Sequence, residues 1–74
     1  MNIPQEISII IIRERISFWT NSQYAAALDV RVAKKIGDEK METAAIENMK
    51  RCEAAIMELE AALKEIESGP ETPS

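Results

Sequence analysis

Hydrophobic residues in the second half of the chain recur with the spacing of a coiled-coil seam. At intervals of 4, 3, 4, 3, 4 and 3 residues, the chain carries Ala45, Met49, Cys52, Ile56, Leu59, Leu63 and Ile66. An uninterrupted heptad pattern predicts a helix that packs against another helix. We therefore expect a helix over about residues 39–67. Gly69 and Pro70 then end it, and residues 68–74 form a flexible tail.

The first half carries a similar pattern with one interruption. Its apolar positions form two sets, Ile9, Ile12, Ile16 and Trp19, then Ala25, Leu28, Val32 and Ile36. The two sets are out of phase across the polar segment 20–23. Either a single helix over about residues 4–36 continues with a stutter in the repeat, or Ser22 caps a new helix. We favour the single helix because it matches the second in length. A strand over Ile7–Ile12 would suit β-branched residues, but this run lacks alternation and a partner strand.

Gly37 and Asp38 stand between the two patterns. Glycine favours the left-handed conformation that ends a helix, and aspartate is a common first cap of the next one. The competing interpretation is one long helix with an interior glycine, at a cost of about 1 kcal/mol relative to alanine. Equal arm lengths favour the hairpin. The sequence therefore predicts an all-α fold, an antiparallel helical hairpin over residues 1–67.

A single hairpin of this length buries little apolar surface, so we expect it to form a homo-oligomeric helical bundle. Chains of 74 residues bury only a modest fraction of their surface. The four consecutive isoleucines Ile9–Ile12 point in four directions around a helix, and one partner helix cannot cover them all. The expected oligomer core consists of Ile9, Ile12, Ile16, Trp19, Met49, Cys52, Ile56, Leu59, Leu63 and Ile66.

Charge and composition narrow the possible partners. Residues 1–37 carry five basic and three acidic side chains, and residues 38–74 carry four basic and ten acidic ones. A net acidic chain is a poor ligand for double-stranded nucleic acid. Neither a secretory signal nor a membrane span is expected, because the longest apolar run is too short for either. We expect a cytoplasmic protein, in the host cytoplasm if a bacteriophage encodes it.

Few side chains suit catalysis or metal binding. The chain has no histidine, which removes the commonest general base and the commonest transition-metal ligand. Cys52 lies in the heptad seam, so we interpret it as a small buried hydrophobic residue and not as a nucleophile. The glutamates of the second half lack the Glu-x-x-His motif of bundle metal sites. We expect no catalytic residue, no metal and no cofactor.

The segment from Phe18 to Tyr24 is the most suggestive candidate for a ligand site. It contains all three aromatic residues of the chain and four small or amide polar residues. Aromatic faces with amide and basic groups would suit a nucleotide-like ligand. The candidate ligand residues are Trp19, Asn21, Gln23, Tyr24, Arg13, Arg15, Arg31 and Lys35. The alternative is an aromatic core pair at the stutter, with the basic residues, Lys34 among them, paired to the acidic second helix.

Two resemblances extend this picture. In its length, its two equal helices and its acidic tail, the chain resembles the hairpin dimers of plasmid RNA-binding Rop-type proteins. Because the sequence has no recognisable RNA-binding motif, this resemblance does not imply that the chain binds RNA. From Trp19 through an alanine-rich stretch and an Ile-Gly-Asp turn to Leu63, it also resembles small bacteriophage and prophage accessory proteins. That resemblance implies a chain that occupies a protein surface or sequesters a ligand, in opposition to a host defence.

These observations leave two hypotheses and make an enzyme the least favoured. The first is a non-enzymatic oligomeric interaction protein, a phage-type accessory or inhibitor that binds a host or virion protein. The alternative is a nucleotide-binding sponge whose pockets form between subunits around Trp19 and Tyr24.

Overall fold

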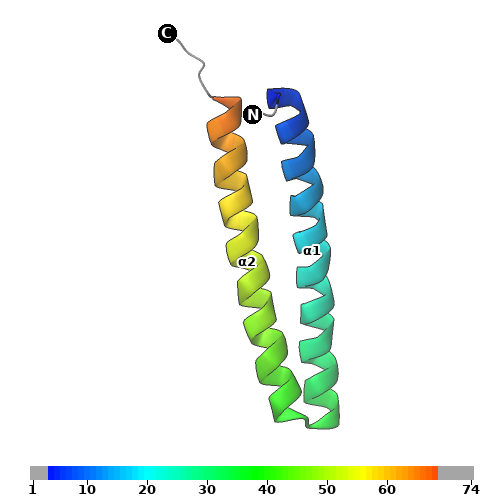
Figure 1. Cartoon of the computed structure of the whole chain (residues 1–74). Helices are drawn as coiled ribbons and strands as arrows, with labels where there is room; N and C mark the ends of the chain where they lie inside the picture. The colour runs from blue at the N-terminus through cyan, green and yellow to red at the C-terminus, as the bar shows by residue number, and fades with distance from the viewer. Residues whose placement is uncertain (1–3, 69–74) are drawn as a thin grey trace.

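The protein is a hairpin of two long antiparallel helices, seen in a computed structural model that describes residues 4–68. Helix α1 spans Gln5–Ile36 and helix α2 spans Glu39–Glu67, with 32 and 29 residues. At 1.5 Å per residue each is about 45 Å long. The helices lie side by side along their whole length, and the start of α1 lies at the same end of the hairpin as the end of α2 (Figure 1). This confirms the all-helical hairpin.

The connection between the helices is two residues long. Gly37 has φ 74° and ψ 27°, a left-handed conformation that glycine adopts without strain. Its N–H donates to the carbonyl of Lys34, and the N–H of Asp38 donates to the carbonyl of Ala33 over 2.9 Å. The Asp38 carboxylate then accepts from the N–H of Met41 over 3.0 Å. These bonds end α1, begin α2 and satisfy backbone groups that would otherwise lack partners.

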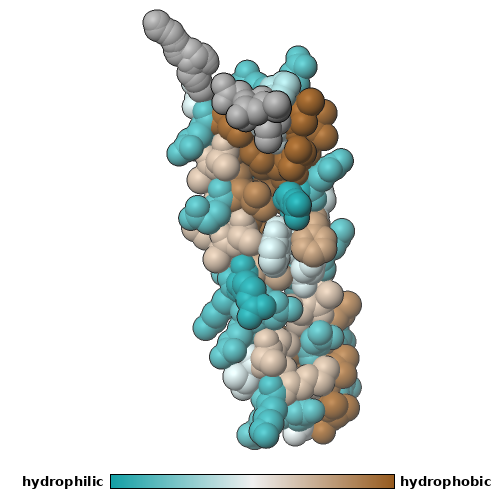
Figure 2. All heavy atoms as spheres, viewed as in Figure 1, coloured by the Kyte–Doolittle hydropathy of each residue, from teal (hydrophilic) through white to brown (hydrophobic). Residues whose placement is uncertain are grey.

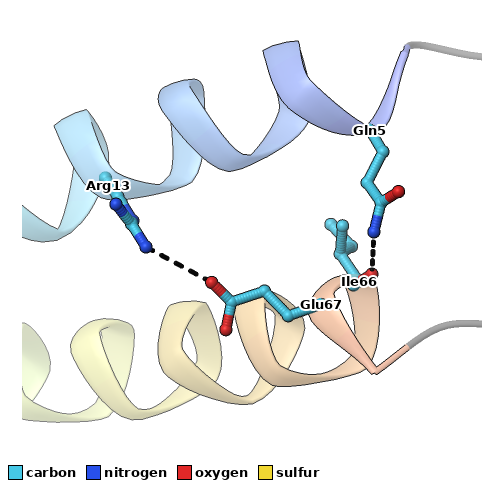
Figure 3. Close-up of polar contacts among 4 residues, drawn as sticks. All are labelled: Gln5, Arg13, Ile66 and Glu67. Carbon is cyan, nitrogen blue, oxygen red and sulfur yellow. Dashed lines mark hydrogen bonds and ion pairs between the residues drawn. The ribbon is translucent and has the colours of Figure 1, made fainter.

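At the open end of the hairpin, polar side chains of α1 contact the end of α2. The Gln5 amide donates to the carbonyl of Ile66, and Arg13 lies 3.3 Å from the carboxylate of Glu67 (Figure 3). Ser68 caps α2 by donating its hydroxyl to the carbonyl of Lys64 over 2.8 Å. Gly69, Pro70 and the rest of the predicted tail lie outside the described residues.

Helix α1 is continuous through Thr20–Gln23, as favoured from the sequence, but its inner face is not the predicted one. Leu28, Val32 and Ile36 are exposed by 61%, 46% and 64%, and Ala25 is also exposed. The prediction that these four continue the packing seam is therefore wrong. Instead, the heptad spacing of the first apolar set runs on through the polar segment without a change of phase. The buried or half-buried residues at this spacing are Ile9, Ile12, Ile16, Trp19, Gln23, Ala26, Val30 and Ala33.

We call these eight residues, together with the heptad positions of α2 from Ala45 to Ile66, the inner seam. Its most deeply buried members are small residues: among residues 4–68, the side chains with almost no accessible surface are Ala26, Ala33, Ala45 and Cys52. Small side chains let the two backbones approach closely. The larger seam residues are half-buried, because a pair of helices encloses its seam on only two sides. Hence a single hairpin has a core without a large enclosed side chain.

No segment of the two helices, within residues 4–68, is long and apolar enough to cross a membrane.

Candidate functional site

The most distinctive surface of the hairpin is the side of α1 that faces away from α2. Large apolar side chains there remain uncovered: Ile7, Ile10, Ile11, Phe18, Tyr24, Leu28, Val32 and Ile36 are each exposed by 41–65%. In Figure 2 hydrophobic atoms gather at the open end and recur along the α1 edge, whereas the α2 edge is mostly hydrophilic. Contiguous apolar patches on a small protein usually mark an interaction site.

On α2 the outer surface is different in kind. Its exposed large apolar residues are Ile46 at 37% and Met57 at 65%, and they stand among charged side chains. The helix carries eight acidic and four basic residues, whereas α1 carries three acidic and five basic ones. The two helices therefore present opposite net charges, −4 and +2.

Phe18 and Trp19 form an aromatic pair that lies partly outside the seam. Their ring centroids are 5.4 Å apart and the ring planes make an angle of 82°, an edge-to-face arrangement. Trp19 is half-buried in the inner seam, while Phe18 is 56% exposed. Trp19 thus belongs to the packing of the hairpin and offers only part of its indole to a ligand.

The candidate ligand residues do not converge within one hairpin. All eight come from α1, and Arg13 and Lys35 stand about 33 Å apart along its axis. Trp19 and Gln23 face α2, whereas Asn21, Tyr24, Arg31 and Lys35 are exposed. Tyr24, Arg31 and Lys35 share one side with Leu28, because their spacings of 4, 3 and 4 residues bring them into line.

Two hollows on the surface of residues 4–68 are lined by residues other than these candidates. One, of about 430 Å³, lies between the helices and is lined by Asp29, Met41, Ala44, Ala45, Glu47, Asn48 and Arg51. The other, of about 440 Å³, is lined by Glu60, Ala61, Leu63, Lys64 and Glu67 of α2. Both are open depressions. We name the side of the hairpin with the first hollow the cavity side.

Only part of the predicted pairing between basic and acidic helices occurs. Arg13 pairs with Glu67, and Lys34 lies 4.0 Å from Glu42. Within residues 4–68, Arg15, Arg31 and Lys35 form no ion pair closer than this. Exposed pairs of this kind contribute at most about 1 kcal/mol each, so these contacts orient the helices more than they stabilise them.

Cys52 is fully buried, with no accessible surface, as expected for a small residue of the heptad seam. No group of three or more potential metal-binding side chains occurs in the described part of the chain.

Sequence reasoning missed the outer face of α1. The signal was present in Ile11, Phe18, Ala25 and Val32, which recur every seven residues and therefore lie in line. The expected oligomer-core residues other than Cys52 are half-buried in the single hairpin. The structure thus places them on the inner seam, with part of their surface still open.

Comparisons with known proteins identify no relative. No family model, no curated protein and no solved structure matches the chain.

Proposed function

We propose that the chain is a non-enzymatic interaction protein that works as a homo-oligomeric helical bundle. One observation carries the proposal: eight large apolar side chains along α1 remain uncovered in the single hairpin. Leaving them in water forfeits about 25 cal/mol for each Å² of apolar surface. Association with further copies and with a partner protein would recover that free energy.

The second contact surface of the proposal is the side of α1 that carries Tyr24, Leu28, Arg31 and Lys35. Tyr24 and Leu28 are exposed by 65% and 61%, and the two basic side chains form no ion pair within residues 4–68. An aromatic anchor beside arginine is a composition common at binding hot spots. The partner that fits this surface is a protein with an acidic rim around an apolar patch. This mode of action agrees with the resemblance to phage-type accessory or inhibitor proteins.

A nucleotide-binding sponge is less well supported. Its candidate residues are spread along α1, half of them point away from the rest, and neither hollow contains any of them. Such a site would need side chains from several copies at once.

Native mass spectrometry of freshly purified protein, followed by a denaturing run, tests the proposal. We expect an assembly whose mass is a multiple of the 8.3 kDa chain, without additional small-molecule mass. A folded monomer at micromolar concentration would contradict the oligomer. Extra mass of nucleotide size that denaturation releases would support the sponge instead.

The partner surface is tested by exchanging two charges. We expect Arg31→Glu with Lys35→Glu to reduce capture of the protein partner from extracts of the source cell at least tenfold, with the assembly mass and helix content unchanged. The matched control is Lys50→Glu with Lys64→Glu, which makes the same charge change on α2. Equal capture by both double variants would exclude this surface as the contact.

A further inference from the structure

The two-residue turn fixes which residues of the two helices lie level with each other. It places Ile36 level with Glu39, and residues at equal distances from these two lie level along both helices. Each heptad residue of α2 from Ala45 to Ile66 then lies level with an inner-seam residue of α1. The Lys34–Glu42 pair departs from this register by one residue. The turn, the seam and this pair thus agree on one register.

At the open end of the hairpin, long side chains bridge larger offsets. Arg13 and Glu67 stand five residues from equal levels, about 7 Å along the axis. The Gln5 amide likewise reaches the carbonyl of Ile66 across four residues. These contacts depend on the reach of the side chains, and the turn sets the level of the backbones.

The cavity side of α1 carries two adjacent lines of residues. The first contains Asp29, which lines the hollow, and the residues at intervals of seven before it, Ser8, Arg15 and Ser22. The second, which we call the outer stripe, contains Ile11, Phe18, Ala25 and Val32. Members of the two lines are three or four residues apart, and such residues are neighbours on a helix. The outer stripe therefore borders the cavity side.

We propose that the cavity side of the hairpin docks on the same side of a second copy, with the two turns at opposite ends. Helix α1 then packs on α1 of the second copy and α2 on α2, around a two-fold axis that crosses the face at Ser22. The proposal rests on the oligomer proposed above and specifies its contact face.

Charge complementarity within α1 selects a second copy as the occupant of this face. Arg15 lies seven residues before Ser22, and Asp29 lies seven residues after it. Against an antiparallel copy centred on Ser22, Arg15 therefore meets Asp29, and the pair occurs twice. Within residues 4–68 neither side chain forms an ion pair inside one hairpin. The second copy thus supplies the opposite charge for both.

The outer stripe is complementary to itself about the same axis. Phe18 and Ala25 are centred within half a residue of Ser22, and so are Ile11 and Val32. The exposed ring of Phe18 then packs on the small Ala25 of the second copy, which allows the helices to approach closely. Ile11 packs on Val32 at both ends of the stripe. Three large side chains of each copy that are exposed in the single hairpin are covered in this way.

On α2 the cavity side has a matching symmetry. Ser22 is level with Glu53, and Arg51 and Glu58 are centred within two residues of that level. An antiparallel second copy of α2 therefore brings Arg51, which lines the hollow, close to Glu58. Residues of unequal size that face each other beside this pair are Met41 with Ala62 and Asn48 with Ala55. The axis that suits α1 thus suits α2 as well.

The competing arrangement keeps both turns at one end and packs α1 on α2 of the second copy. The net charges of the helices, +2 and −4, favour it at long range. At equal levels, however, it sets Phe18 beside Glu58 and Ile11 beside Glu65, and burying carboxylates against apolar side chains is costly. Because salt screens exposed charges outside the contact, the residues within the contact decide the orientation.

Docking leaves the proposed partner surface free. Tyr24 and Arg31 lie two residues after Ser22 and Asp29, which places them about 160° away around the helix. They therefore point away from the second copy. Because α1 packs on α1, the bundle carries both copies of the partner surface on one side.

Cysteine cross-linking at the axis tests this arrangement. A residue on a two-fold axis meets its own copy, and a disulfide requires Cα atoms within about 7 Å of each other. We expect Ser22→Cys alone to give a linked dimer when the folded chain is oxidised briefly. The matched control is Thr20→Cys, half-buried like Ser22 but in line with Arg13 on the opposite side, and it should not link. The unmodified chain, with its buried thiol, serves as the blank.

A mixture of two variants detects the competing arrangement. Ser22→Cys and Ala55→Cys, which are within two residues of equal levels, are made in chains of different tag length and refolded together before oxidation. We expect no linked pair of unequal chains, and such a pair in place of the Ser22→Cys dimer would establish α1 on α2. Linking of Thr20→Cys alone would place the interface on the opposite side. No linking in an intact oligomer would exclude the cavity side, whereas a monomer in native mass spectrometry would remove the proposed oligomer itself.

Exchanging the charges of α1 provides a second measurement. Arg15→Asp and Asp29→Arg should each raise the dissociation constant of the assembly about tenfold. The double variant should restore it, because the exchanged charges meet again across the axis. Within one chain the two positions are about 21 Å apart along α1, too far to pair. Lys50→Asp, which makes the same charge change as Arg15→Asp on α2, is the control, and a double variant as weak as the single ones would overturn the proposal.

Discussion

At the scale of single residues, this hairpin is organised around small side chains. Ala26, Ala33, Ala45 and Cys52 are the positions with almost no accessible surface among residues 4–68. Close packing leaves no room there for added atoms. The stability of the hairpin should therefore respond to enlargement at these positions and not at their neighbours.

Ala26 and Ala27 provide a matched test of this dependence. Ala26 is 1% exposed and Ala27 is exposed. We expect Ala26→Leu to lower the free energy of unfolding by about 1–3 kcal/mol through overpacking, and Ala27→Leu to leave it nearly unchanged. Urea denaturation at one fixed protein concentration measures both. If Ala26→Leu were as stable as the parent, the helices would not be held at the close approach described here.

The turn depends on one backbone conformation. Gly37 has φ 74°, and an added Cβ would meet no atom within 4 Å. The cost of Gly37→Ala is therefore conformational alone, about 1–2 kcal/mol of unfolding free energy. Gly37→Asn should cost less, because asparagine tolerates the left-handed region. Chemical denaturation compares the two variants, and equal losses would point to a contact of the side chain instead.

At the scale of elements, α1 has two apolar faces and the polar segment 20–23 belongs to both. Its inner seam runs through Gln23 without a change of phase, while Asn21 faces outward. A glutamine side chain in the seam buries less apolar surface than leucine would. The seam thus contains a polar position that packing within the hairpin does not require.

Replacing that glutamine tests the continuous seam. Gln23→Leu should raise the free energy of unfolding by about 1 kcal/mol through added apolar burial. Asn21→Leu, which adds similar apolar surface on the outer face, should not. Thermal and urea unfolding of the two variants at equal concentration provide the comparison. If Asn21→Leu alone raised the free energy of unfolding, the face of α1 that packs against α2 would change at the polar segment, as a stutter predicts.

The sequence predicted the hairpin well because the heptad spacing of α2 and the Gly37–Asp38 pair carry strong local signals. It misled about α1 because hydrophobicity alone ranks Leu28, Val32 and Ile36 above Gln23, Ala26 and Ala33 as inward positions. In the structure the series with the smaller side chains faces α2, because small side chains let the two helices approach closely. The scattered ligand candidates show the same limit, since side-chain chemistry in one segment does not specify on which side of a helix each residue lies.

At the scale of the whole molecule, the hairpin is extended, with a radius of gyration of 16.8 Å. A compact chain of this length would have about 11 Å. Because only two helices enclose the seam, its larger residues keep part of their surface open to solvent. Association of copies would cover that surface, and stability should then depend on the concentration of the chain.

Melting experiments measure that dependence directly. For a dimeric assembly we expect the melting temperature to rise by about 5 °C for each tenfold increase in protein concentration. The measurement is circular dichroism over a concentration range of two decades or so. A melting temperature that stays constant over this range would mean that the isolated hairpin is stable by itself.

The burial of Cys52 makes the rate of thiol modification a measure of how readily the two helices separate. Its thiol is the only one in the chain and has no accessible surface, so a thiol reagent modifies it only when the helices part. When reclosing is faster than the reaction, the modification rate relative to that of the unfolded chain gives the equilibrium constant for opening. Every variant discussed above that retains this single thiol can therefore be compared in dilute buffer, without denaturant, by the fraction of molecules that are open at equilibrium.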